Sequence, residues 1–114
     1  MANKTNLFRI LEDNVNAGAT DTNLSPIVPN GKSAVVLVFG GALLFEATGS
    51  YVALQWGDAS GGWQTVRVIA KEGEYHLNRE FIGDGVKRFR IVRRNTDTSA
   101  RPIIAWIEGL IHDA

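Results

Sequence analysis

Residues 33–69 read SAVVLVFGGALLFEATGSYVALQWGDASGGWQTVRVI, and this stretch decides the fold class. Short runs rich in Val, Leu, Phe, Tyr and Trp alternate in it with interruptions that contain Gly, Asp or Ser. Aromatic and β-branched residues favour extended backbone, whereas Gly, Asp and Ser favour turns. We therefore predict four strands here, at residues 33–39, 42–47, 51–56 and 63–69.

The same pattern continues toward the C-terminus. Residues 74–77 predict a short strand, and residues 86–94 predict a longer one. Residues 102–111 (PIIAWIEGLI) are also compatible with a helix, because no proline follows Pro102. However, β-branched residues dominate this segment and Gly109 would weaken a helix, so we predict a strand.

Seven or eight strands with no helical pattern between them indicate an all-β chain. Two antiparallel sheets packed face to face and a small barrel are the two architectures that fit such a series. We predict an antiparallel β-sandwich with jelly-roll-like connectivity.

The first thirty residues differ from the rest. Residues 7–11 (LFRIL) predict a short strand, and residues 14–30 predict a long irregular connection that contains Pro26 and Pro29. Long connections of this kind are often functional or wrap around a partner. We accordingly divide a single domain into an N-terminal strand and extended arm, residues 1–30, and a sandwich body, residues 31–114.

Composition restricts the possible partners. The 114 residues include 12 Lys or Arg and 12 Asp or Glu, so the formal net charge is zero, which argues against a nucleic-acid partner. There is no cysteine, so neither disulfides nor thiolate metal sites are expected. The longest uncharged run, residues 33–45, is too short to span a membrane, and the polar first ten residues do not form a secretion signal.

The sequence offers little catalytic chemistry. It has two histidines, His76 and His112, and no Gly-x-Ser-x-Gly motif that would present a nucleophilic serine. Glu72, Glu74 and Glu80 are interpreted as a solvated rim rather than as the carboxylate pair of a glycosidase. We predict that the chain is not an enzyme and binds neither a metal nor a cofactor.

Arginines dominate the segment at residues 87–94. Strand alternation places Arg88, Arg90 and Arg94 on one face, and it places Phe89, Ile91 and Arg93 on the other. The first face admits three interpretations: a solvated surface, a site for carboxylates of a protein partner, or a track for a nucleic-acid backbone. The residues that we predict to bind a partner are Phe8, Arg9, Pro26, Pro29, Arg88, Arg90 and Arg94.

A second candidate surface is aromatic. Tyr51, Trp56 and Trp63 flank a glycine-rich turn, and aromatic rings on a β-sandwich can stack on sugars or on bases. Trp56 shares its alternation with Val52 and Leu54, which favours a place in the core. Whether Trp56 and Trp63 form core or platform stays open at this point.

The layout as a whole resembles a known family. A neutral, cysteine-free chain of this length, with a polar arm, glycine-punctuated strands and the closing segment PIIAWIEGL (residues 102–110), is similar to the small jelly-roll decoration, or cement, proteins of tailed-phage capsids. The resemblance implies a virion protein, made in the host cytoplasm, that docks between capsomers on the capsid surface and reinforces the shell. It implies two partners, the major capsid protein and further copies of the chain in a homo-oligomer. The alternative is a carbohydrate- or receptor-binding module of a phage appendage.

Overall fold

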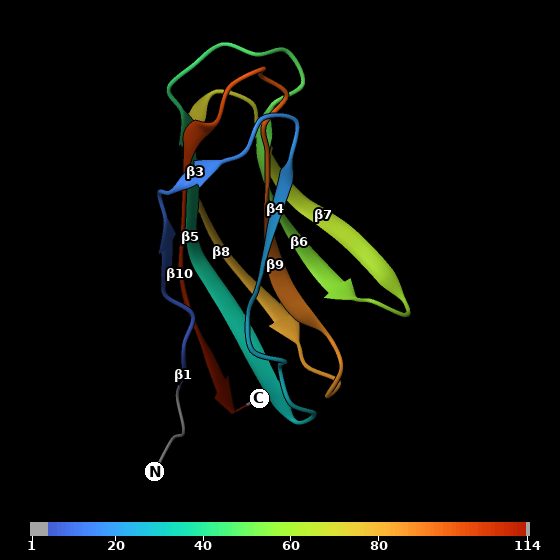
Figure 1. Cartoon of the computed structure of the whole chain (residues 1–114). Coiled ribbons are helices and arrows are strands. Elements are labelled where there is room, and N and C mark those ends of the chain that lie inside the picture. Colours follow the sequence, from blue (N-terminus) through green and yellow to red (C-terminus); the bar gives the residue numbers. More distant parts are fainter. Residues whose placement is uncertain (1–4, 114) are drawn as a thin grey trace.

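The computed structural model describes residues 5–113 and consists of two antiparallel sheets packed face to face (Figure 1). The predicted all-β sandwich is therefore confirmed, and no helix occurs among the described residues. The first sheet has the order β1 (Thr5–Asn6), β10 (Arg101–Asp113), β5 (Lys32–Leu43), β8 (Glu72–Ile82), and β2 (Arg9–Leu11) and β3 (Asn14–Val15) also pair with β10. The second has the order β4 (Thr20–Leu24), β9 (Arg88–Arg94), β6 (Tyr51–Asp58), β7 (Gly62–Ile69).

The connectivity is that of a jelly roll. The chain turns back between β6 and β7, and the strands before and after this turn pair in nested order: β6 with β7, β5 with β8, β4 with β9, and β1 to β3 with β10. Successive pairs alternate between the two sheets, as in jelly rolls. The nesting places the segments at residues 5–6, 9–11 and 14–15 beside the last strand.

One strand prediction was wrong at the glycine pair. We expected separate strands at residues 33–39 and 42–47, but β5 continues through Gly40 and Gly41 and ends at Leu43. Gly40 lies opposite Trp106 of β10, and a Cβ at position 40 would overlap the indole ring. The indole crosses β5 at this point, and its Nε1 donates a hydrogen bond of 2.8 Å to Oε2 of Glu74 on β8. Glycine here makes room for a neighbouring side chain instead of forming a turn.

Two further boundaries differ from the prediction. The short strand expected at residues 74–77 is the middle of β8, which has 11 residues. We expected an irregular connection over residues 14–30. This prediction was wrong at residues 14–15 and 20–24, which form β3 and β4, whereas residues 25–30 lie outside the strands as expected. β4 is polar because it is an edge strand that needs backbone pairing with β9 more than it needs apolar side chains.

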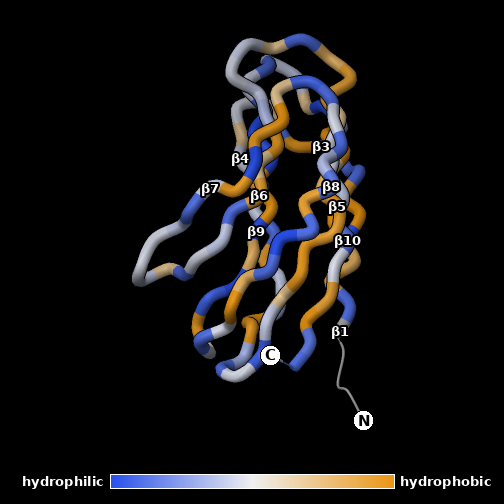
Figure 2. Tube along the Cα trace, turned by 180° about the vertical axis from the view of Figure 1, so that it is seen from behind, coloured by the Kyte–Doolittle hydropathy of each residue, from blue (hydrophilic) through white to orange (hydrophobic). Residues whose placement is uncertain are grey.

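The core lies between the sheets. Figure 2 shows hydrophobic stretches along the central strands, whereas the projecting β6–β7 hairpin is mostly pale to hydrophilic. An aromatic cluster joins the two sheets at one end, where the ring of Trp56 is 4.6 Å from Phe89 and 5.2 Å from Phe81. Other fully or nearly fully buried side chains include Val28, Val36, Phe39, Leu54 and Ile103. Residues 5–113 contain no helix that could cross a membrane.

Gly109 provides a test of the β10–β5 pairing. The register shifts between Glu108 and Gly109, and a Cβ at position 109 would collide with the backbone carbonyl of Val35. Because backbone cannot yield as a side chain can, we expect Gly109→Ala to lower the free energy of unfolding by about 2 kcal/mol. Urea denaturation followed by circular dichroism measures this difference.

Gly73→Ala is the matched control. A Cβ at position 73 would meet the Tyr75 ring at 3.6 Å, an ordinary van der Waals contact, so we expect a change within about 0.5 kcal/mol. Equal effects of the two substitutions would contradict the close approach of β10 to β5 at the bulge.

Candidate functional site

β9 presents two chemically different faces, as alternation predicts. Phe89, Ile91 and Arg93 point between the sheets and are buried, whereas Arg88, Arg90 and Arg94 are half-buried on the outside. The inward face therefore places an arginine in the core, with only 1 % of Arg93 exposed. A charged group at this depth requires partners for every donor.

The guanidinium group of Arg93 uses all five of its N–H donors. Nε and Nη2 bind Oδ2 of Asp21 at 3.0 and 2.7 Å, and Nη2 also binds Oδ1 of Asp13 at 2.8 Å. Nη1 donates to the backbone carbonyls of Asp13 at 3.1 Å and Ile103 at 2.8 Å. One side chain of the second sheet thus holds β4, the turn after β2 and strand β10 of the first sheet.

Asn95, two residues after Arg93, adds hydrogen bonds to the same part of the N-terminal segment. It is fully buried, and its Nδ2 donates to the carbonyls of Val15 at 2.8 Å and Ser99 at 2.9 Å. Its backbone N–H donates to the carbonyl of Ala19 at 3.0 Å. We call Arg93 and Asn95 the polar clasp, since together they fix residues 13–21 to the body of the sandwich. The sequence prediction of partner-binding residues included neither of them.

The clasp also acts on an exposed carboxyl group. The hydrogen bond from Arg93 and the positive charge of its guanidinium both lower the pKa of Asp13 below its ordinary value. The ionised form of Asp13 is therefore favoured by folding.

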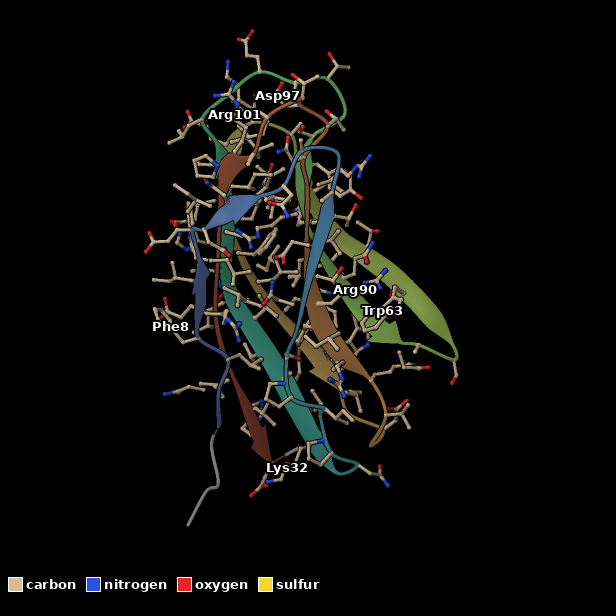
Figure 3. The ribbon with its side chains drawn as sticks, in the orientation of Figure 1. Phe8, Lys32, Trp63, Arg90, Asp97 and Arg101 are labelled. Carbon is tan, nitrogen blue, oxygen red and sulfur yellow. The ribbon has the colours of Figure 1, made fainter. Side chains whose placement is uncertain are left out.

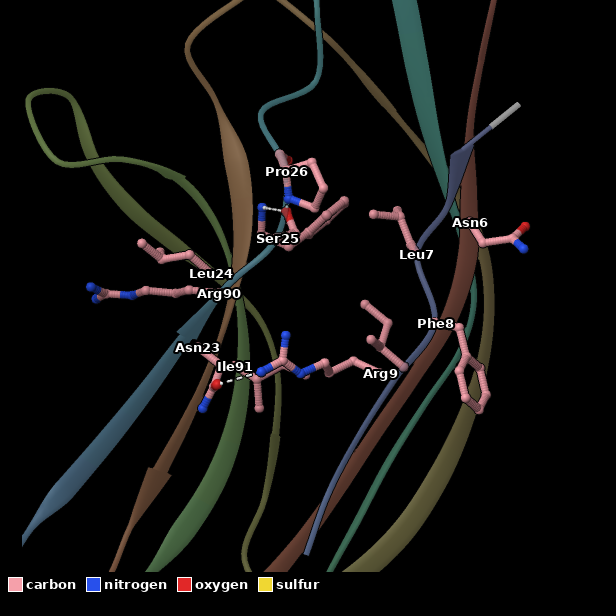
Figure 4. Close-up of a pocket in the computed structure, with 12 residues that line it drawn as sticks. Asn6, Leu7, Phe8, Arg9, Asn23, Leu24, Ser25, Pro26, Arg90 and Ile91 are labelled. Atoms are coloured by element: carbon pink, nitrogen blue, oxygen red, sulfur yellow. Dashed lines mark hydrogen bonds between the residues drawn. The ribbon is translucent and has the colours of Figure 1, made fainter. Parts of the chain in front are cut away.

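A shallow cleft opens where the two sheets part, between β1–β2 and β4 (Figure 4). Its volume is about 90 Å³, and buried Leu7, Ile91 and Ile107 contribute to its apolar lining. Nη2 of Arg9 donates to Oδ1 of Asn23 at 3.1 Å and so links the first sheet to β4. Ser25 and Pro26 line the other end of the cleft (Figure 4).

The predicted partner-binding residues fall into three places. Four line the cleft, although the ring of Phe8 points away from it and is exposed (Figure 4). Two more arginines lie on the outer face of β9, and the remaining proline lies in the turn before β5, where its carbonyl accepts a hydrogen bond of 3.1 Å from the Lys32 N–H. The residues of the cleft are Phe8, Arg9, Pro26 and Arg90. The two further arginines of β9 are Arg88 and Arg94, and the proline before β5 is Pro29.

The outward arginines Arg90 and Arg94 of β9 contact neighbouring side chains and a carbonyl but form no ion pair with a carboxylate of the described residues. The guanidinium of Arg90 lies 4.3 Å from the centre of the Trp63 ring (Figure 3), and its Nε donates to Oε1 of Gln55 at 2.6 Å. Arg94 donates to the Gly18 carbonyl and to Thr20. None of the salt bridges among the described residues involves the outward arginines of β9.

The aromatic set is divided between core and surface. Trp56 is buried in the aromatic cluster, so it belongs to the core and not to a surface platform. Trp63 is half-buried on the outside, where Arg90 covers it. Because the two tryptophans lie on opposite faces of the second sheet, they do not form a common stacking platform.

Neither a comparison with models of known protein families nor one with curated proteins found a match. Within residues 5–113 no three His, Asp or Glu side chains gather as a metal site would require. His76 approaches Glu74 at 3.3 Å, and His112 approaches Glu80 at 3.8 Å. The described residues offer a cleft at one edge and two broad sheet faces as surfaces for contact.

Arg93→Met tests the clasp. Methionine fills part of the space but donates no hydrogen bond, so two backbone carbonyls lose a partner. Asp13 and Asp21 can recover water, because 77 % and 37 % of their side chains are exposed, which makes the loss smaller than for a fully buried pair. We expect the free energy of unfolding to fall by about 2–4 kcal/mol, as measured by urea denaturation.

Arg88→Met is the control on the same strand. Arg88 has an outward side chain outside the clasp, so the expected change is within about 0.5 kcal/mol. If Arg93→Met were as mild as Arg88→Met, the clasp would not contribute to stability.

Asp13 makes part of the stability depend on pH. Its folded pKa lies below the unfolded value of about 3.9, so its contribution is fully present above that value and is lost as pH falls through the folded pKa. We expect Asp13→Asn to lower the melting temperature at neutral pH, and the difference from wild type to disappear in strong acid. Thermal melts across this pH range measure it, and a difference that does not change with pH would be the contrary result.

Proposed function

We propose that the chain is a structural protein of a virus particle that binds the outside of a tailed-phage head and stabilises the shell. The jelly-roll sandwich and the resemblance in layout support this proposal. One observation supports it most: the segments that border the cleft carry four exposed apolar side chains between residues 8 and 27. These are Phe8 (63 % exposed), Ile10 (52 %), Leu24 (50 %) and Ile27 (40 %), and of them Phe8 and Leu24 belong to residues of the cleft lining.

Such side chains are costly to leave in water. Burying a large apolar side chain contributes about 1.5–3 kcal/mol, so a partner that covers several of them gains substantial affinity. The edge also combines a shallow apolar cleft with the hydrogen-bonding groups of Arg9, Asn23 and Ser25. We propose this edge as the surface that faces the shell, because a protruding apolar side chain of a coat protein fits a cleft of this size and chemistry.

Rigidity suits the same role. The polar clasp and the backbone pairing of β4 with β9 hold residues 13–24 in place before any partner binds, so little ordering entropy is lost on docking. On a symmetric shell, many modest contacts of identical copies then sum to firm attachment.

The alternative of a carbohydrate- or receptor-binding module of a phage appendage has less support. It relied on Trp56 and Trp63 as a joint platform, and Trp56 lies in the core. Trp63 and Tyr51 remain on the outward side of the second sheet, and the Arg90 guanidinium lies over the Trp63 ring.

Purified particles of the virus that encodes the chain test the proposal. We expect the chain in intact heads at a near-stoichiometric ratio to coat protein, measured by quantitative mass spectrometry. Its absence from particles would contradict the proposed function.

A variant tests the docking edge separately. Pro26→Ser combined with Ile27→Ser removes two exposed apolar groups beside the cleft, and we expect binding to heads at least about tenfold weaker, the equivalent of about 1.4 kcal/mol. Leu44→Ser, at a 71 % exposed position in the loop after β5, is the matched control and should bind as wild type does. Equal binding by both variants would place the contact elsewhere.

A further inference from the structure

The two outer faces of the sandwich carry opposite charge. Residues paired across neighbouring strands point to the same side of a sheet, so the register identifies each face. In the first sheet Trp106, Gly40 and Glu74 form one outward row. The next two rows contain Glu108, Val38 and His76, and then Leu110, Val35 and Glu80.

We call this surface the acidic face. Its outward strand positions include Glu72, Glu74, Glu80 and Glu108, and none of the outward paired positions of β10, β5 and β8 carries Lys or Arg. Two exposed apolar residues, Phe8 and Ile10, lie along its β2 side, and Ile10 pairs with Trp106. An outer sheet face that combines carboxylates with exposed apolar groups is suited to a basic partner with apolar groups of its own.

The outer face of the second sheet has that chemistry, and we call it the arginine face. Its outward rows contain Leu24, Arg90 and Gln55 in one line, and Thr20, Arg94 and Tyr51 in another. Arg88 and the half-buried Trp63 lie beyond the first row, and exposed Val68 lies on β7. No paired outward position of this sheet carries Asp or Glu.

Within the described residues, the glutamates of the acidic face form no salt bridge with Lys or Arg, and the arginines of the arginine face form none with Asp or Glu. The internal ion pairs of the arginines and lysines use other carboxylates, in the pairs Arg93 with Asp13 and Asp21, Arg101 with Asp97, Lys87 with Asp84, Lys32 with Asp113 and Lys71 with Glu46. On the acidic face, histidines are the only titratable partners of Glu74 and Glu80 among the described residues, and they are charged only when protonated. Glu74 also accepts the neutral N–H of Trp106. The neutral chain is therefore divided into one face whose carboxylates have no Lys or Arg partner and one face whose guanidinium groups have no carboxylate partner among the described residues.

We propose that the partner of the acidic face is the arginine face of a second copy of the chain. The guanidinium groups match the carboxylates, and Phe8 and Ile10 meet a surface that exposes Leu24 and Val68. The body extends 49 × 28 × 18 Å, so its broad faces are large enough for the roughly 800 Å² per partner of an ordinary specific interface. The contact does not depend on the proposed role on a phage head.

A contact between two different faces leaves one face free on each end of a pair. Further copies can therefore add, and the assembly closes into a ring if the rotation between copies permits, or continues as a stack if it does not. In either case association should weaken with salt, because the charges lie at the surface.

Two charge-reversal variants test this arrangement. Glu80→Lys with Glu108→Lys disables the acidic face, and Arg88→Glu with Arg90→Glu disables the arginine face. Circular dichroism and thermal melts check that both variants fold. Sedimentation velocity of the full-length chain, up to about 1 mM protein, measures association free energies down to about 4 kcal/mol.

We expect the average mass of the wild type to rise with protein concentration and to fall with added salt. Each variant should associate with itself at least tenfold more weakly than the wild type. A contact needs one acidic face and one arginine face, and each variant keeps only one of the two intact. An equimolar mixture of the two should form a one-to-one complex and nothing larger, since one acidic face and one arginine face remain intact.

Three results would overturn the proposal. The wild type could remain monomeric over the whole concentration range, either variant could associate as the wild type does, or the mixture could fail to form the complex. None of these results bears on the presence of the chain in virus particles, so this proposal and the proposed function fail separately.

Discussion

The buried guanidinium of Arg93 is the interaction on which the arrangement of the N-terminal segment depends. A jelly roll must bring the first strands of the chain back to the last, yet residues 13–24 contain few large apolar side chains to hold them there. Arg93 replaces that missing apolar contact with five hydrogen bonds, two of them to carbonyls and three to carboxylates. An arginine suits the position because its planar fork can satisfy several acceptors at once.

With the N-terminal segment in place, the backbone of the edge strands is poorly suited to pair with a strand of another chain. β4 and β1 to β3 form one side, and β7 and β8 form the other. β8 carries a bulge at which Asn78 has φ of 46°, and Arg79 and Arg67 pack over the rings of Phe81 and Tyr75 along that side. Charged groups and a bulge discourage the addition of a further strand. Side-chain contacts, at the cleft and on the broad faces, are therefore favoured over strand addition.

The sequence predicts the sandwich well because alternation is a local property. It places the strands of residues 51–69 and the closing strand, and it separates the two faces of β9. It fails at Gly40, where the reason for glycine is an indole 66 positions away, and at β4, whose pairing with β9 leaves no apolar pattern. Alternation also assigns Arg93 to the side of Phe89 and Ile91, which signals burial. Its carboxylate partners lie 80 and 72 positions away, so no local pattern identifies them.

Hydrogen exchange of the native protein tests most directly whether Arg93 holds the N-terminal segment in the fold. Mass spectrometry of peptides from residues 13–24 and from β6 would compare the wild type with Arg93→Met under conditions far from global unfolding. The account predicts protection of residues 13–24 in the wild type, and at least tenfold faster exchange of that segment in the variant while β6 stays protected. Unprotected exchange of residues 13–24 in the wild type, or equal rates in both proteins, would contradict it.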